Sequence, residues 1–475
     1  MSAAQSTSAP SAPSALPAPS SLLRRNRSFR LLWLGQVVSQ LGDWFNTVAV
    51  YALLLELTGS ATAVAWMMVV QLLPIAVFGP AAGVLVDRVD RIRLMIAADL
   101  VRGVAILGLL LVRGPEHVWL AYAVMATSVT ATAFFEPARS ASIPSVVARE
   151  DLLTANAIGT ATWSAVLAIG AGLGGLVTAL VGRDAAFVIN SLSFFGSALF
   201  ICRIRIAAPT PVALAEPAGA RAARGIGAPA SERAWRGAGA PAIVSNDELE
   251  RVSSFSDLAE GLRYLRRHGA VAALTFVKAG WAIAGGAVLL LTVFGERVFP
   301  LGQSAAAGIG VLYAARGVGA GVGAVFTRRA FHNDAVRLRR AVGPAYFACG
   351  ACYALLGFAP NLWVAAATVI GAHIAGSILW IASSVLLQMA VPDRFRGRVF
   401  SAELVTLALM SSFMSFATAT AFDRFGLPAQ SLAKIVGLLF CLPGFAWYLV
   451  EVALRRQAPA PGEVTESPAP PRVLE

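Results

Sequence analysis

The sequence has 475 residues, of which 57% are hydrophobic and only 13% are charged, and its mean hydropathy is +0.69. A soluble domain of this composition would lack the polar surface needed to cover its core, so the composition excludes an ordinary water-soluble fold and indicates a polytopic membrane protein. The formal net charge of +12 comes largely from arginines between apolar runs. This placement favours topology signals and contacts with anionic lipid over nucleic-acid binding.

Apolar runs dominate the chain from residue 31 onward. The first, 31–57, follows a cluster of arginines and is too long for the core of a signal peptide, so it predicts an uncleaved first helix. Each later run has about the 20 residues that a helix needs to cross a bilayer. These runs lie at 62–86, 94–112, 118–136, 157–181, 184–203, 270–294, 304–326, 341–358, 361–387, 399–421 and 430–453. The sequence therefore predicts an all-α integral membrane protein with twelve transmembrane helices, six on each side of a central segment.

Basic residues gather in alternate connections between these runs, and this predicts that both termini are cytoplasmic. The central segment is rich in Ala, Pro, Gly and Arg, which is typical of a linker. After it, Ser254 and Asp257 are spaced to cap an amphipathic helix on the inner membrane surface. The predicted domains are a disordered tail (1–23), an N-terminal six-helix half (24–206), a cytoplasmic linker (207–253), the interfacial helix with a C-terminal six-helix half (254–456), and a second disordered tail (457–475).

A short charged break follows the second apolar run, and it reads Gly83-Val84-Leu85-Val86-Asp87-Arg88-Val89-Asp90-Arg91-Ile92-Arg93. It resembles the loop between the second and third helices of the major facilitator superfamily, whose pattern is G-x-L-a-D-R-x-G-R-R/K. Gly83, Leu85, Asp87, Arg88 and Arg91 match that pattern, whereas Asp90 replaces its glycine. The resemblance implies a bundle of two six-helix halves that rock about a central site.

Two further segments resemble one branch of that family, which includes macrolide-efflux and siderophore-export proteins. Residues 391–400 are similar to its P-x-x-x-R-G-R signature between helices ten and eleven, with Arg396 and Arg398 as the signature arginines. Residues 135–139 resemble its connection between helices four and five. In the fifth run, Gly170, Gly174 and Gly175 resemble the antiporter motif G-P-x-x-G-G, with Ala171 replacing the proline. The same glycines also suit close helix packing.

Asp43 is the strongest candidate for proton coupling. A charged group at the centre of a bilayer costs about 2.5 to 3.5 kcal/mol on insertion scales, so it is a functional candidate by default. Gln36, Gln40, Asp43 and Thr47 share one helical stripe, which we expect to line a cavity or a neighbouring helix. Proton coupling by Asp43 and a structural hydrogen bond or ion pair both remain open.

The tenth run has a similar polar stripe. In the family, helices one, four, seven and ten surround the cavity, so we expect this stripe and two helix-seven residues to face it. Stacking on the tryptophans and simple core filling remain alternatives, as do proton coupling at His373 and an interhelical hydrogen bond. The candidates are His373, Ser377, Trp380, Ser384 and Gln388 of the tenth run, and Lys278 and Trp281 of the seventh.

Other charged residues fall inside or close to apolar runs. Arg316 lies deep in the eighth run and needs an acidic or carbonyl partner, for which Asp43 is the equally deep acid. We also treat Arg316 as a proton-coupling candidate. Lys278 is nearer the inner surface and is able to extend its amine toward it. Asp99 and Arg102 are three residues apart, so they can satisfy each other. We call the charged break at 83–93 the gating loop, and we assign Asp99 and Arg102 to its charge network. The other residues of this network are Gly83, Asp87, Arg88, Arg91, Arg396 and Arg398.

No catalytic set emerges from the sequence, which has four histidines and no nucleophile elbow. We predict no enzyme activity, no cofactor and no metal site. The sequence favours a monomeric transporter in the bacterial inner membrane, in contact with membrane lipids, that exports a drug, a macrolide-like or a siderophore-like compound in exchange for protons. A lysophospholipid flippase and a proton-coupled importer are alternatives within transport. A membrane receptor or scaffold without transport activity is the alternative from another class.

Overall fold

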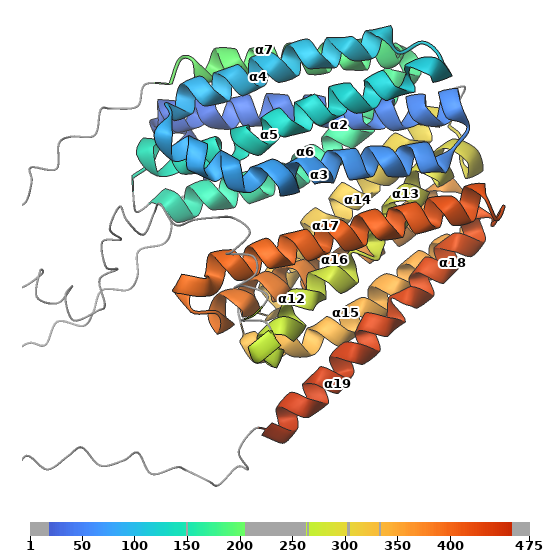
Figure 1. The fold of residues 1–475 in the computed structure, drawn as a ribbon. Coiled ribbons are helices and arrows are strands. Elements are labelled where there is room, and N and C mark those ends of the chain that lie inside the picture. The colour runs from blue at the N-terminus through green and yellow to red at the C-terminus, as the bar shows by residue number, and fades with distance from the viewer. Residues whose placement is uncertain are drawn as a thin grey trace, which may run out of the picture.

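The computed structural model describes residues 19–148, 151–204, 263, 266–301, 305–331 and 334–457 (Figure 1). The first part of the chain forms α1 (Pro19–Arg25), α2 (Arg27–Thr58), α3 (Ala61–Arg88), α4 (Arg91–Leu107), η1 (Gly108–Leu111), η2 (Pro115–His117), α5 (Val118–Val146), α6 (Leu152–Leu180) and α7 (Arg183–Ile201). The second part forms α12 (Gly269–Trp281), α13 (Ala284–Val293), η4 (Phe294–Val298), α14 (Ala305–Phe331), α15 (Ala335–Leu356), α16 (Leu362–Ala390), α17 (Asp393–Asp423), α18 (Ala429–Leu439) and α19 (Cys441–Gln457).

The predicted all-α membrane fold is confirmed. Within the described residues, nine helical segments are long and apolar enough to cross a membrane. The number of twelve crossings stays a prediction. Consecutive helices run back and forth along the bundle, because turns and caps at their ends reverse the chain. At the end of α2, Gly59 adopts a left-handed conformation with φ 64° and donates its N–H to the carbonyl of Leu55, and this conformation is easy only for glycine.

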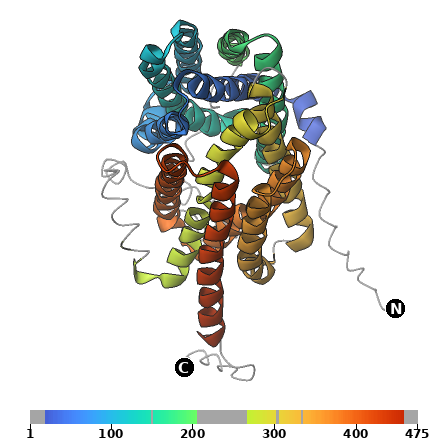
Figure 2. The ribbon, with the colours of Figure 1, turned by 90° about the vertical axis from the view of Figure 1, so that its right-hand side faces the viewer.

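The helices form two groups that lie side by side (Figures 1 and 2). Helices α2 to α7 pack on one another in the first group, and α12 to α19 pack on one another in the second. The groups meet chiefly where α6 packs on α14 and where α3 packs on α17. Glycines allow the first of these contacts: a Cβ atom on Gly175 would lie 2.7 Å from the Cα of Gly310. The close-packing interpretation of the glycines in the fifth run is thus supported, and Gly174 packs equally closely on Phe45.

One end of the bundle carries Arg88, Arg93, Arg328, Arg329 and Arg337, and we call it the basic end. The other, called the opposite end, holds Gly59 and Asp423. At the opposite end, Asp423 and Arg297 of the second group form hydrogen bonds with residues 59–62 of the first group. The structure is therefore closed by polar contacts at that end.

Several helices extend past the apolar runs, because a run marks only the part that lies in lipid. The fourth run was predicted to end at 136, yet α5 continues to Val146 and holds two prolines. The predicted tail 1–23 is wrong at its end, since α1 begins at Pro19 and Leu22 is buried. The predicted linker and most of the predicted interfacial helix lie outside the described residues.

Candidate functional site

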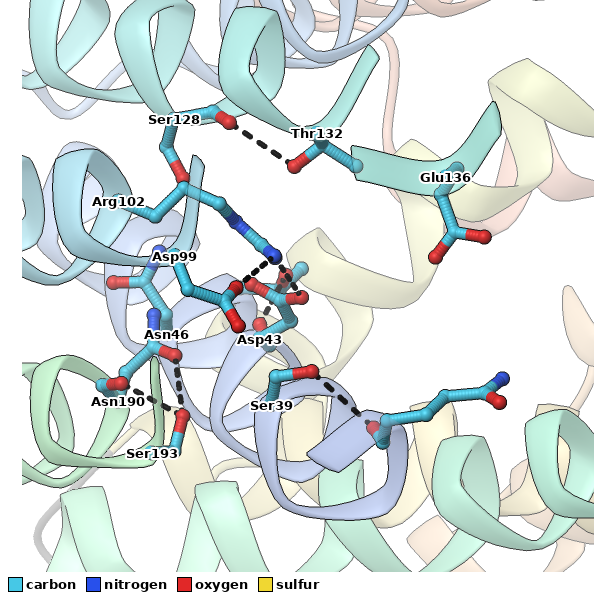
Figure 3. A network of polar contacts seen from close by, with 12 residues as sticks. Ser39, Asp43, Asn46, Asp99, Arg102, Ser128, Thr132, Glu136, Asn190 and Ser193 are labelled. Carbon is cyan, nitrogen blue, oxygen red and sulfur yellow. Dashed lines mark hydrogen bonds and ion pairs between the residues drawn. The ribbon is translucent and has the colours of Figure 1, made fainter. Parts of the chain in front are cut away.

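A buried ionic cluster joins α2 and α4 in the first group (Figure 3). The Arg102 guanidinium places Nη2 2.8 Å from Asp43 Oδ2 and Nη1 3.2 Å from Asp99 Oδ1. The Arg102 side chain is 4% exposed and that of Asp99 is 0% exposed, whereas that of Asp43 is 40% exposed. One arginine thus lies between a fully enclosed carboxylate and an accessible one.

Aromatic rings enclose the arginine of this cluster. The centre of the guanidinium lies 3.9 Å from the Phe194 ring centroid on α7 and 5.6 Å from that of Phe135 on α5. Cation–π contacts of this kind are stronger where water is excluded. The rings therefore help to hold Arg102 between its two carboxylates, and they lower the local dielectric in which the three charges interact.

The predicted pairing of Asp99 with Arg102 is confirmed, whereas their assignment to the charge network of the gating loop stays a prediction. Arg102 lies three turns beyond Arg91 on α4, a distance of about 16 Å at 1.5 Å per residue. The sequence left open whether Asp43 pairs with Arg316, and in the structure Asp43 binds Arg102 instead. Sequence spacing showed the contact within α4, but it did not show that α2 places Asp43 against the same guanidinium.

The polar stripe on α2 faces two different cavities. Gln36 and Gln40 line a cavity of about 470 Å³ within the first group. There Arg139 donates to Gln36 Oε1 at 3.2 Å and pairs with Glu136 at 2.8 Å. Thr47 lines a second cavity. The expectation that this stripe lines a cavity is therefore supported, but its residues line two separate cavities and not a single one.

The second cavity, of about 230 Å³, lies between the two helix groups, and we call it the central cavity. Residues of α2, α3, α12, α13, α14 and α17 line it. The predicted candidates Thr47, Trp281 and Arg316 are among them, and Trp44, Tyr51 and Tyr313 add aromatic surface. The structure thus brings together in one cavity residues from three of the predicted candidate helices.

A second buried ion pair lies in the other helix group. Lys278 Nζ on α12 is 2.8 Å from Glu403 Oε2 and 2.9 Å from Ser384 Oγ, and it lies 4.6 Å from the Trp380 ring centroid. Ser383 donates to the other carboxylate oxygen of Glu403 at 2.5 Å. The Lys278 side chain is only 7% exposed, so the expectation that its amine extends to the inner surface is wrong.

Sequence reasoning missed Glu403 because it set the start of the eleventh helix too late. The apolar run begins at 399, but α17 begins at Asp393. Glu403 therefore lies about 15 Å along the helix instead of in its first turn. A signal was present: an acidic residue inside an apolar run implies a buried partner, and Lys278 was the basic residue in the seventh run.

The predicted stripe on α16 divides between the helix interface and accessible surface. His373 is buried, and its Nε2 lies 3.0 Å from the Tyr353 hydroxyl. Ser377 donates to the carbonyl of Ala320 on α14 at 3.1 Å. These two residues hold helices together, as the interhelical alternative for His373 expected. Trp380 is 42% exposed and packs edge-on against Trp281 at 5.6 Å.

In the predicted gating loop, Asp90 and Arg91 have clear structural roles. Asp90 caps α4 by accepting from the backbone N–H of Arg93 at 2.8 Å, which explains why a carboxylate can replace the glycine of the family pattern. Arg91 Nη1 donates to the carbonyl of Ala141 on α5 at 2.8 Å. Arg88 is exposed. Gly83 and Asp87 lie in α3, and Arg396 and Arg398 lie in α17, but their side-chain positions are outside what the structure describes.

A sequence model of the Major Facilitator Superfamily matches residues 32–415. The chain belongs to the Major Facilitator Superfamily. It is therefore a multi-pass membrane transporter and not an enzyme, and members of this family act on small-molecule substrates.

Relatives of this MFS transporter include proteins named for efflux. Macrolide efflux protein A of Streptococcus pyogenes is 39% identical over 126 residues, which are 26% of this chain and 31% of that protein. The putative bacilysin exporter BacE of Bacillus subtilis (strain 168) is 30% identical over 177 residues, or 37% of this chain and 44% of that protein. The MFS-type transporter YfiS of Bacillus subtilis (strain 168) is 23% identical over 395 residues, or 80% of this chain and 83% of YfiS. Thus the chain spans about a third of the macrolide efflux protein.

Solved structures share the fold. The peptide transporter POT in complex with sulfate has a TM-score of 0.66 at 13% identity, with 92% of this chain and 99% of that chain covered. A mutant of the nucleoside transporter NupG has a TM-score of 0.64 at 11% identity, covering 88% of this chain and 99% of that chain. At such low identity these likenesses concern the fold of the MFS transporter and not its substrate.

Proposed function

We propose that this MFS transporter exports a small organic compound in exchange for protons, and that the Asp43–Arg102–Asp99 cluster binds the transported proton. The observation that carries the proposal is the sharing of one buried guanidinium by two carboxylates that differ in access. When both carboxylates are ionised, the cluster has one negative charge in excess. A proton on one of them removes that excess, which low-dielectric surroundings favour.

The difference in exposure supports separate roles for the two carboxylates of the cluster. Asp43 is 40% exposed and can exchange a proton with water, whereas Asp99 is enclosed and remains the fixed counter-charge of Arg102. Protonation of Asp43 weakens its ion pair with Arg102 and frees α2 from α4 at this point. Arg102 stays paired with Asp99, so no uncompensated cation is left in the membrane interior.

The names of the relatives and the placement of the arginines support export as the direction of transport. Macrolide efflux protein A and bacilysin exporter BacE are named for export, and we infer the same direction here. The basic end faces the cytoplasm under the rule that cytoplasmic loops retain arginine and lysine. The contacts at the opposite end then belong to a state closed to the outside, which precedes or follows uptake of the substrate from the cytoplasm in an alternating-access cycle.

Proton movement in inside-out membrane vesicles tests the proposal. The vesicles hold an imposed pH gradient, and a panel of hydrophobic, cationic, anionic and macrolide-like compounds is added to the native protein and to Asp43→Asn. We expect at least one compound to release protons through the native protein and none to do so through the variant. Asp184→Asn is the matched control, since Asp184 pairs with Arg113 near the opposite end of the bundle, away from the cluster.

Two results would overturn the proposal. Equal proton release by the native protein and Asp43→Asn would show that the cluster does not bind the coupled proton. Transport of labelled compounds without any proton movement in the native protein would reject exchange for protons altogether, and lipid flipping would be the next activity to measure.

A further inference from the structure

We infer that the central cavity binds the carboxylate of a small aromatic acid, and that Arg316 is the residue that anchors it. The inference rests on the proposed function, because it names the chemical class of the exported compound. It concerns a different part of the molecule from the proton cluster. Three observations carry it: an arginine without an acidic partner, the aromatic wall beside it, and the size and place of the cavity.

Arg316 differs from the other cations of the membrane interior. Arg102 and Lys278 each have a carboxylate at 2.8 Å. In the part of the chain that the structure describes, no carboxylate lies within ion-pair distance of Arg316 and no hydrogen bond satisfies it. The described contact of its guanidinium is with the Tyr313 ring, 5.9 Å from the ring centroid. A guanidinium without an acidic partner in the membrane interior favours an anion, and its planar fork fits the two oxygens of a carboxylate.

The cavity supplies a surface for the rest of such a compound. Trp44 and Tyr51 each approach the Tyr313 ring, with centroids 6.3 Å and 6.2 Å apart, and Trp281 lines the same space. Flat rings of this kind stack on an aromatic ligand. At about 230 Å³ the cavity is below the roughly 300 to 1,000 Å³ of ordinary drug sites. The geometry therefore selects a small aromatic acid over a macrolide.

The position of the cavity suits coupling to the proton cluster. Thr47 lines the cavity and lies one turn beyond Asp43 on α2, about 6 Å along the helix axis. The Thr47 hydroxyl donates to the Asp43 carbonyl at 2.8 Å. The cavity also lies between the two helix groups, where a bound ligand contacts both at once. A ligand at Arg316 therefore acts on the helix that carries the proton site and on the relative position of the groups.

Three probes of equal shape and different charge test the inference: 2-naphthoate, 2-naphthamide and 2-naphthamidine. Their binding to the purified full-length protein in lipid nanodiscs is measured by isothermal titration calorimetry. We expect naphthoate to bind at least ten times more tightly than the neutral amide, and the amidine to bind more weakly than either. Arg316→Gln should remove the difference between naphthoate and amide, and Arg316→Lys should keep part of it. Arg113→Gln, which loses an arginine near the opposite end of the first group, should keep all of it.

The result that overturns the inference is equal or weaker binding of naphthoate relative to naphthamide by the native protein. This measurement needs no variant, so it remains decisive if Arg316→Gln does not fold. A preference for naphthoate that persists in Arg316→Gln overturns the role of Arg316. Because calorimetry requires no transport, these outcomes are separate from the vesicle experiment: proton exchange driven by neutral or cationic compounds, without naphthoate binding, would reject the anion site and retain the proposed function.

Discussion

Asp423 connects the two helix groups at the opposite end, and its removal should open that end. Its carboxylate accepts from the Ser60 and Thr62 hydroxyls at 2.6 Å and 2.7 Å and from the backbone N–H groups of Ala61 and Thr62 at 3.0 Å and 2.7 Å. It thereby caps the N-terminus of α3 from a helix of the other group. These contacts exist only while the opposite end is closed, because α3 and α17 separate when it opens.

The size of the effect follows from these contacts. A net hydrogen bond contributes about 0.5 to 1.5 kcal/mol, and loss of a helix N-cap costs about 0.5 to 2 kcal/mol. Asp423 is exposed, so in the variant water forms hydrogen bonds with much of what the carboxylate contacted. We therefore assign about 0.5 kcal/mol to each lost hydrogen bond. Four contacts then give about 2 kcal/mol, which corresponds to about a 30-fold shift in the equilibrium between closed and open states.

Distances between two spin labels measure this shift. The four native cysteines are replaced, and labels are attached at Glu116 in the first group and at Pro360 in the second, both exposed at the opposite end. Asp423→Ala should increase the population with the longer distance about 30-fold, or to near saturation. Asp184→Ala removes a carboxylate that pairs within the first group, so it should leave the distribution unchanged. An unchanged distribution in Asp423→Ala would refute the reasoning.

Two further predictions concern helix packing. Lys278→Met should lower the apparent melting temperature strongly, because an uncompensated Glu403 in the interior costs about 3 to 5 kcal/mol. Adding Glu403→Gln should restore most of the lost stability. A double variant no more stable than Lys278→Met alone would contradict the pairing. Gly175→Val should lower stability by about 1 to 3 kcal/mol through overpacking against Gly310, whereas Gly172→Ala should be tolerated since its Cβ would lie 3.4 Å from the nearest atom. Equal melting temperatures for these two glycine variants would show that α6 and α14 can separate at no cost.

The sequence sufficed for features that depend on one helix at a time. A bilayer needs apolar segments of a fixed length, so the helices could be located from hydropathy, and the family pattern was visible in five residues of one loop. The placement of Asp43 inside the membrane followed in the same way. The contact of Asp99 with Arg102 is also local, since three residues span nearly one helical turn.

Contacts between helices could not be predicted in this way. Asp43 and Arg102 meet because α2 and α4 both pack on α7. The spacing of polar and apolar residues within α2 or α4 does not predict this packing. Prediction of the Lys278–Glu403 pair would have required the correct start of α17 at Asp393. In both cases the partner could not be identified from the sequence, because the choice among possible partners requires the relative rotation of two helices.

If an organic anion is exchanged for a proton, transport should depend on the membrane potential. For a one-for-one exchange, export of an organic anion and entry of a proton both move positive charge inward, so each cycle transfers two charges across the membrane. At about 2.3 kcal/mol per charge per 100 mV, a potential of 100 mV contributes about 4.6 kcal/mol, or more than a thousandfold in the attainable gradient. In proteoliposomes with a potential set by potassium and valinomycin, movement of labelled 2-naphthoate should therefore respond steeply to a potential that is negative on the basic side. Movement of labelled 2-naphthoate that is indifferent to the potential would reject one-for-one exchange of this anion for a proton, since that exchange cannot occur without moving two charges.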